Sequence, residues 1–553
     1  MSVRLSPARE NLWVAALAVA PLLLLLDAAV AIDAPVFVAV ARQIVLAPAD
    51  PFGFQMIWDP TSPDTAVFNR NPPLLSYWLA PWIAVFGERE TVMHAALLPF
   101  PVIAALAFLG LARRLAGRGF EPALLLVATP AFSVLASTLL LDLPVLAFWL
   151  LAVYALVRGA ESESSGWLLA AGLAAALAGL TKYVGFATAP LLAAGVWLLC
   201  RRRASGLLCV LAPLLLAWST WGAYTQWRYG FVHFLGSTDV VLGRSFELRE
   251  LGNQIASVPV YYGAALLFPV WRAAGAFARG ERGLGRAVLG LLLGAAVVKW
   301  VLPAGEPPRR AAFGIDDAVL GAIACAGAFW LWSGFLERAR SAASAQDQFL
   351  LLWLAGLLVF SSVLNWHVNA ADALLAAPPA LLLLFRDTDL RPSRRAVGLW
   401  LVLTLPFSWL LAAADAEQGD VYRAAARRIA AEIGAQPGAR WFVGHWGLQH
   451  YLEREGFQSV VPPMYGRSDL AAGDWVAAAR NVSQIDVSQN MRRFTLREAW
   501  TWNFTTWLPV RTTNADAGAG FYSHHAGYLP FAFSNLPLDR VQLGRVVVGA
   551  PRP

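Results

Sequence analysis

Charged side chains are scarce in this sequence: Asp, Glu, Lys and Arg make up 14% of its 553 residues, and 58% are hydrophobic. Soluble globular chains carry about 25% charged and about 45–50% apolar residues. The shortage excludes an ordinary soluble fold for most of the chain, because a lipid-facing surface has to be apolar. Cysteine is also rare, with three residues beside apolar runs, so no disulfide framework is predicted.

Lysine is almost missing, and the formal net charge of +7 is therefore carried by arginine. The arginines gather in short loops between apolar runs, which is typical of membrane topology signals. A nucleic-acid-binding protein would instead show a basic face interleaved with aromatic residues. We therefore predict no nucleic-acid partner.

Apolar runs long enough to approach the ~20 residues that a spanning helix needs recur along the chain. About thirteen are predicted, which makes the fold class an α-helical polytopic membrane protein. The runs are 11–31, 94–111, 121–139, 143–157, 167–180, 184–200, 207–224, 258–270, 287–302, 318–336, 349–364, 372–384 and 397–414.

Arginine placement predicts the orientation of these helices. Alternate short loops carry the arginines at 4–9, 113–118, 201–203, 279–286, 338–340 and 391–395. Such loops belong on the cytoplasmic side. The N-terminus is therefore expected to be cytoplasmic and the C-terminal region extracytoplasmic.

Two predicted extracytoplasmic segments are too long to be simple connectors. The first loop, 32–92, contains predicted helices at Val36–Ile44 and Leu74–Phe86 that would lie along the membrane interface. The second divides the chain into a transmembrane domain, 1–414, and a small C-terminal α/β domain, 415–553. Its predicted elements are helices at 421–433 and 448–455 and strands at 440–443, 458–461, 475–478 and 541–548.

Several ionisable residues are predicted at the outer ends of the helices, where buried charge marks functional sites. Asp33 directly follows the first run, although with Pro35 it could simply cap the next helix. Asp142 is flanked by leucines at the return after the third run. Lys182 and Lys299 could reach to the interface. Cations around one outer cavity would bind a phosphate, and a carboxylate would serve as a base.

At these positions the sequence resembles the GT-C superfamily of polyprenyl-phosphate-sugar-dependent glycosyltransferases, within the bacterial branch similar to protein O-mannosyltransferases and lipid A aminoarabinose transferases. The resemblance covers nearly the whole chain. It rests on several motifs in order: Asp33 at the start of a long first loop, Asn71-Pro72-Pro73-Leu74, Asp142-Leu143-Pro144, Thr181-Lys182-Tyr183-Val184-Gly185, and the tail segment Gly444–Tyr451.

The resemblance implies transfer of a sugar from a polyprenyl phosphate to an acceptor hydroxyl, with inversion, in a bacterial inner membrane and on its periplasmic face. The acceptor could be a glycan, a lipid or a protein. It implies that Asp33 is the base and Asp142 a second catalytic carboxylate. The predicted substrate-binding residues are Arg70, Asn71, Lys182, Tyr183 and Lys299.

Two residues depart from the family pattern. Ala34 stands where relatives commonly have a second carboxylate, and Asn71 stands where they often have Lys or His. No cofactor is therefore assigned, and a divalent metal remains an alternative.

The tail histidines give a weaker signal. His445 and His450 are not spaced for one helix face, and His524 and His525 are adjacent, so we expect hydrogen-bonded surface histidines and no zinc site.

Two other functions stay open. The chain could be a transporter or flippase of a lipid-linked or anionic substrate, since such proteins also carry intramembrane charges. The missing second carboxylate would also suit an inactive assembly partner.

Overall fold

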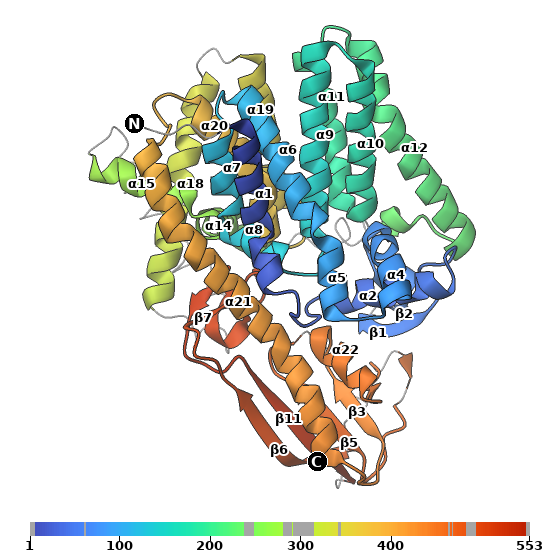
Figure 1. Cartoon of the computed structure of the whole chain (residues 1–553). Helices are drawn as coiled ribbons and strands as arrows, with labels where there is room; N and C mark the ends of the chain where they lie inside the picture. Colours follow the sequence, from blue (N-terminus) through green and yellow to red (C-terminus); the bar gives the residue numbers. More distant parts are fainter. Residues whose placement is uncertain are drawn as a thin grey trace.

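A computed structural model describes residues 6–59, 62–236, 248–279, 290, 315–340, 344–462, 465–466, 468–482 and 494–548. Most of these residues form helices, and a smaller sheet lies at the C-terminal end (Figure 1). The amino terminus and the C-terminal sheet lie at opposite ends of the molecule (Figure 1).

The first loop begins earlier than predicted, because helix α1 (Pro7–Leu24) ends seven residues before Ala31. Helix α2 (Ala34–Leu46), the paired strands β1 (Gln55–Asp59) and β2 (Ser62–Asp64), and helices α3 (Thr65–Phe68) and α4 (Leu74–Phe86) follow. The buried Ser76 hydroxyl of α4 donates to the Phe37 carbonyl of α2 at 2.9 Å. The opposite face of α4 exposes Tyr77, Trp78 and Trp82, as the predicted position along an interface requires.

Six helical segments of the described chain are long and apolar enough to cross a membrane: 90–115, 142–162, 203–229, 317–340, 345–364 and 394–433. They contain helices α5 (Glu90–Leu97), α6 (Pro99–Leu115), α9 (Asp142–Ser162), α12 (Arg203–Tyr229), α18 (Ile315–Arg340), α19 (Ala345–Val359) with its π-helical end η4 (Phe360–Leu364), and α21 (Arg394–Ile433). Shorter helices between them are α10 (Ser165–Thr181), η1 (Tyr183–Ala187), α11 (Thr188–Leu199) and α20 (Ala370–Arg386). The predicted count of about thirteen spans is not confirmed, and the run 287–302 lies outside the described residues.

Two predicted runs are broken helices. The run 121–139 forms α7 (Phe120–Val127) and α8 (Pro130–Ala136), because Thr129 caps α8 by accepting from the Phe132 N–H and Pro130 occupies the first helical turn. The run 258–270 is split between α14 (Leu248–Leu266) and α15 (Phe268–Ala278) by Leu267, whose φ is 60°.

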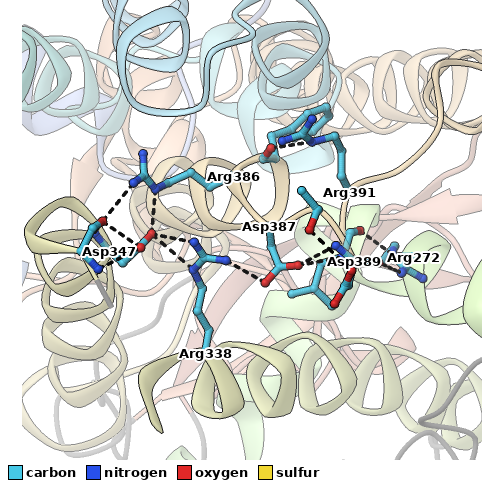
Figure 2. A network of polar contacts seen from close by, with 11 residues as sticks. Arg272, Arg338, Asp347, Arg386, Asp387, Asp389 and Arg391 are labelled. Atoms are coloured by element: carbon cyan, nitrogen blue, oxygen red, sulfur yellow. Dashed lines mark hydrogen bonds and ion pairs between the residues drawn. The ribbon is translucent and has the colours of Figure 1, made fainter. Parts of the chain in front are cut away.

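Several of the arginine-rich ends lie together at the end of the bundle away from the sheet. Arg113 of α6 pairs with Glu10 of α1, and Arg394 of α21 with Glu121 of α7. Figure 2 shows a second group, in which Asp347 at the start of α19 binds both Arg338 of α18 and Arg386 of α20. These ion pairs tie the ends of seven helices together.

Helix α21 runs without a break through the predicted domain boundary at 414 and the predicted separate helix at 421–433. Beyond it, a five-stranded sheet has the order β4-β3-β5-β11-β6, parallel at β4-β3-β5 and antiparallel at β5-β11-β6. Its elements are β3 (Arg440–Val443), α22 (Trp446–Arg454), β4 (Gln458–Ser459), β5 (Trp475–Ala479), β6 (Phe494–Phe504) and β11 (Asp539–Val548). Short strands β7 (Val510–Arg511), β8 (Thr513–Asn514), β9 (Ala519–Gly520) and β10 (Ala532–Phe533) lie between β6 and β11.

Candidate functional site

Asp33 occupies the N-cap position of α2, but its side chain makes no capping hydrogen bond. The simple capping interpretation is therefore wrong. The preceding Ile32 has φ 53°, an unusual backbone conformation for a β-branched residue. The Asp33 side chain is exposed, and it accepts no hydrogen bond from the described residues. The fold thus presents a carboxylate that local structure does not use.

Asp142 and Lys182 form an ion pair, with the Lys182 Nζ 2.8 Å from the Asp142 Oδ1. Asp142 lies in the first turn of α9, and Lys182 is the residue that ends α10. The Lys182 side chain remains 32% exposed. One cation therefore holds a carboxylate and still has surface available for a ligand.

Asp33, Asp142 and Lys182 lie close enough to interact electrostatically. Asp33 is exposed to solvent, yet the surrounding protein raises the pKa of its carboxyl to about 6. Desolvation is the largest cause. Lys182 opposes this increase and Asp142 adds to it. A base with such a pKa is ionised at neutral pH and still accepts a proton readily.

A third carboxylate, Asp372, belongs to this group and was missed by the sequence analysis. It lies in the first turn of α20 and interacts electrostatically with Lys182. The Asn365 amide donates to both of its oxygens, at 3.1 and 3.0 Å, and the Asn369 N–H donates at 3.2 Å. The signal available in the sequence was a capping box, Asn369 with Asp372, before an apolar run.

Tyr183 is enclosed by aromatic side chains next to Lys182. Its hydroxyl accepts from the Trp221 Nε1 at 2.9 Å and lies 2.5 Å from the His233 Nδ1. The His233 ring stacks on Phe52 of the first loop, with ring centroids 5.0 Å apart. The hydroxyl thus organises an aromatic cluster beside Lys182, and substrate binding by Tyr183 stays a prediction.

The first loop approaches the same place through residues 69–71. The Asn69 backbone hydrogen-bonds the His233 ring, and the Asn69 side chain accepts from the Asn71 N–H at 3.2 Å. Arg70, between them, is half-buried. The turn that carries Arg70 and Asn71 is therefore linked to Lys182 through His233 and Tyr183, while Lys299 lies outside the described residues.

The prediction of surface histidines in the tail is wrong for three of the four. His445, His450 and His524 are buried, because α22 packs against the first loop and the segment around His524 packs against the start of α20. His445 stacks on Trp58, and burial lowers the pKa of His450 to about 3. They are hydrogen-bonded or packed core groups.

A divalent metal does not fit the residues of the site. Lys182 already neutralises Asp142, and Ala34 leaves Asp33 without a carboxylate beside it. Within the described ranges, no three His, Cys, Asp or Glu side chains are grouped so that they could hold a metal ion.

Residues 70–222 match the family model for dolichyl-phosphate-mannose-protein mannosyltransferase. The match makes this part of the chain similar to a family of glycosyltransferases. The matched region contains Arg70, Asn71, Asp142, Lys182 and Tyr183, and Asp33 precedes it. The family match therefore covers most of the predicted site residues but does not reach the predicted base.

Solved structures are similar to this chain only at a low level. ArnT from Cupriavidus metallidurans bound to undecaprenyl phosphate is 13% identical with a TM-score of 0.42, over 90% of this chain and 97% of that chain. The apo form of the same protein is 15% identical with a TM-score of 0.43, over the same shares. The S. cerevisiae Pmt1-Pmt2 complex bound to its sugar donor is 21% identical with a TM-score of 0.28, over 42% of this chain and 33% of that chain. A search of curated proteins finds no match to the sequence.

Proposed function

We propose that the protein transfers a sugar from a polyprenyl-phosphate donor to an acceptor hydroxyl on the extracytoplasmic face of the bacterial inner membrane. One observation carries the proposal: an uncapped, exposed carboxylate, Asp33, faces the charged group of Asp142 and Lys182. The donor class is supported by the matched family, whose description names a dolichyl-phosphate sugar. The N-terminus is then cytoplasmic, and the sheet at the opposite end is periplasmic.

In the proposed reaction, the acceptor oxygen attacks the anomeric carbon from the face opposite the phosphate. The new C–O bond forms as the bond from the anomeric carbon to the phosphate oxygen breaks, which inverts the configuration. Asp33 takes the proton from the acceptor hydroxyl. The lipid phosphate leaves as an anion, so the protein must chiefly stabilise its growing negative charge.

The charges of the site limit which cation can stabilise the leaving phosphate. Lys182 is the common partner of Asp33, Asp142 and Asp372, so this group carries more negative than positive charge. A phosphate placed among these residues alone would be repelled. We therefore assign the phosphate to the side of Lys182 that faces the 69–71 turn, with Arg70 as the second cation. Asn71 would donate a further hydrogen bond, and Lys299 remains a predicted ligand.

The decisive test replaces Asp33 with asparagine in protein reconstituted with a short polyprenyl-phosphate sugar and an acceptor extract. Asp33→Asn keeps the shape but cannot accept the proton, so transfer should fall by about 10²–10⁴-fold. Asp27→Asn is the matched control, because Asp27 is a 75% exposed carboxylate six residues earlier that pairs with Arg423. Equal transfer rates in Asp33→Asn and wild type would refute the assignment of Asp33 as the base. Movement of the donor across the bilayer with no covalent product would favour a transporter.

A further inference from the structure

A polar hollow lies at the C-terminal sheet, beside the end of β5, the end of β6 and the start of β11. Strand residues alternate between two faces, and here Trp502, Val541 and Leu543 are buried on one face, where Arg428 of α21 lies 5.2 Å over the Trp502 ring. Arg540 and Gln542, on the other face of β11, line the hollow together with Asn503 at the end of β6, and its volume is about 620 Å³. That volume lies in the range of small-molecule sites, about 300–1,000 Å³.

The frame of the hollow is fixed by one buried carboxylate. Asp539 is 1% exposed, and its Oδ1 accepts the backbone N–H groups of Arg480 at 3.0 Å, Asn481 at 3.0 Å and Arg540 at 2.6 Å. The end of β5 and the start of β11, which lie far apart in sequence, are thereby held side by side. Asn514 donates to the carbonyls of Pro537 and Leu538 and so holds the neighbouring wall. The arginine side chains project from a rigid base.

The side chains that line the hollow offer both donors and acceptors. Arg480 makes a two-bond contact with Asp516, at 2.9 and 3.0 Å, and Arg540 donates to the Asn503 side chain at 3.2 Å. Gln542 adds a further amide, and Leu536, which is 44% exposed, adds an apolar strip beside Pro537. The two arginines are balanced by Asp516 and Asp539, so the lining is formally neutral.

These properties select one ligand class. A multiply charged ligand would find no excess of opposite charge. A purely apolar ligand would remove water from these polar groups and offer their remaining donors and acceptors no hydrogen bond in return, which costs free energy. A saccharide has hydroxyls that both donate and accept, and a C–H face that suits the Leu536–Pro537 strip.

We propose that this hollow binds a neutral, hydroxyl-rich glycan and that this glycan is the acceptor, an inference that rests on the proposed glycosyltransferase function. The sheet lies at the same end as the first loop, since the Tyr451 hydroxyl of α22 accepts from the Val30 N–H at 2.9 Å and His445 stacks on Trp58. A glycan held on the sheet would therefore be retained on the side of the molecule where Asp33 lies. Among the three acceptor classes left open by the sequence, this favours the glycan.

The test uses the full chain in lipid nanodiscs, since sugar-headed detergents would compete for the hollow. The probes are neutral trisaccharides of glucose, galactose and mannose, followed by saturation-transfer NMR and by titration. Wild type should bind at least one of them. Arg540→Gln and Asn503→Ala should each weaken that binding by about tenfold, because each removes a hydrogen-bonding group of the hollow, a charged one in the case of Arg540. Arg497→Gln, an exposed arginine on β6 outside the hollow, is the matched control and should bind normally.

Failure of this inference is distinguishable from failure of the proposed function. Absence of saturation from all three trisaccharides with wild type, or equal binding by wild type and Arg540→Gln at an unchanged melting temperature, overturns the glycan site. Asp33→Asn should bind the trisaccharide as wild type does while losing sugar transfer. If the wild-type protein binds the glycan but transfers no sugar from any donor, the glycan site is supported and the proposed glycosyltransferase function is refuted.

Discussion

Asp33 depends on residues far away in sequence for its chemical character. Its position after α1 provides the carboxylate, and the surrounding protein, Lys182 and Asp142 set its pKa to about 6. A proposed base works only when it is ionised. Because the pKa is raised, protonation begins at a higher pH than for an ordinary aspartate, and activity is lost as the pH falls through that value.

The pH profile of kcat/KM should therefore show an acid limb near pH 6 in the wild-type protein. Lys182→Met removes the positive charge that lowers the Asp33 pKa, so its limb should move to higher pH, whatever the loss in absolute rate. Lys182→Arg keeps the charge and should leave the limb near its wild-type position. An unmoved limb in Lys182→Met would show that Asp33 is not the group that titrates.

At the same scale, the sequence predicted Asp33, Asp142 and Lys182 at one end of the molecule, and the structure brings them together. Their common end could be predicted because each lies next to an apolar run at an end that the arginine pattern places on the same side of the membrane; their roles stay predictions. Asp372 has the same relation to its run but was not predicted as a site residue; in the structure it also forms a capping box with Asn369. Its proximity to Lys182 depends on how α20 packs against other helices, which a single sequence does not record.

Single elements were predicted best where local signals were complete. Helix α4 was predicted with the correct bounds, because its apolar pattern lies between Pro73 and Gly87, whose φ is 79°. Strand β6 was missed, because a bulge opposite Leu543 and Gly544 breaks the alternation of its side chains. The run 121–139 was predicted as one helix, although Thr129 and Pro130 were visible as a cap and a helix start.

The helix ends in Figure 2 provide a stability test at this scale. Arg338 binds Asp347 at 3.0 Å and Asp387 at 2.8 Å with 22% of its side chain exposed, whereas Arg201 pairs with Glu163 at 86% exposure. Arg338→Ala leaves two carboxylates short of a partner and should cost roughly 1–3 kcal/mol of unfolding free energy. Arg201→Ala should cost less than about 0.5 kcal/mol. Thermal unfolding of both variants in the same detergent measures the two losses of stability. Equal losses would contradict a structural role for the ion pairs of Arg338.

Across the whole molecule, the C-terminal part is interlocked with the membrane helices. A segment of the tail, residues 512–527, reaches back between them. Thr512 and Tyr522 both donate to the half-buried Asp415 of α21 at 2.6 Å. The Phe521 carbonyl accepts from Ala370, and the His524 N–H donates to the Val368 carbonyl. The tail therefore supports the start of α20, two residues before Asp372.

Tyr261 of α14 fixes this segment, since its buried hydroxyl lies 2.5 Å from the Gly520 carbonyl and 2.7 Å from the Gly527 carbonyl. Tyr261→Phe removes this hydroxyl from both oxygens; the Gly520 carbonyl keeps the Ser523 N–H at 3.0 Å, and the Gly527 carbonyl loses its Tyr261 donor. Local opening should therefore become easier by about 1–3 kcal/mol. Hydrogen exchange of peptides covering 366–372 and 518–528 should then speed up by about tenfold or more. Tyr77→Phe, which removes an exposed hydroxyl bonded to Pro48, should leave both peptides unchanged. If exchange rises in the 518–528 peptide alone, the tail does not support α20, and the C-terminal part acts on the site only by binding the acceptor.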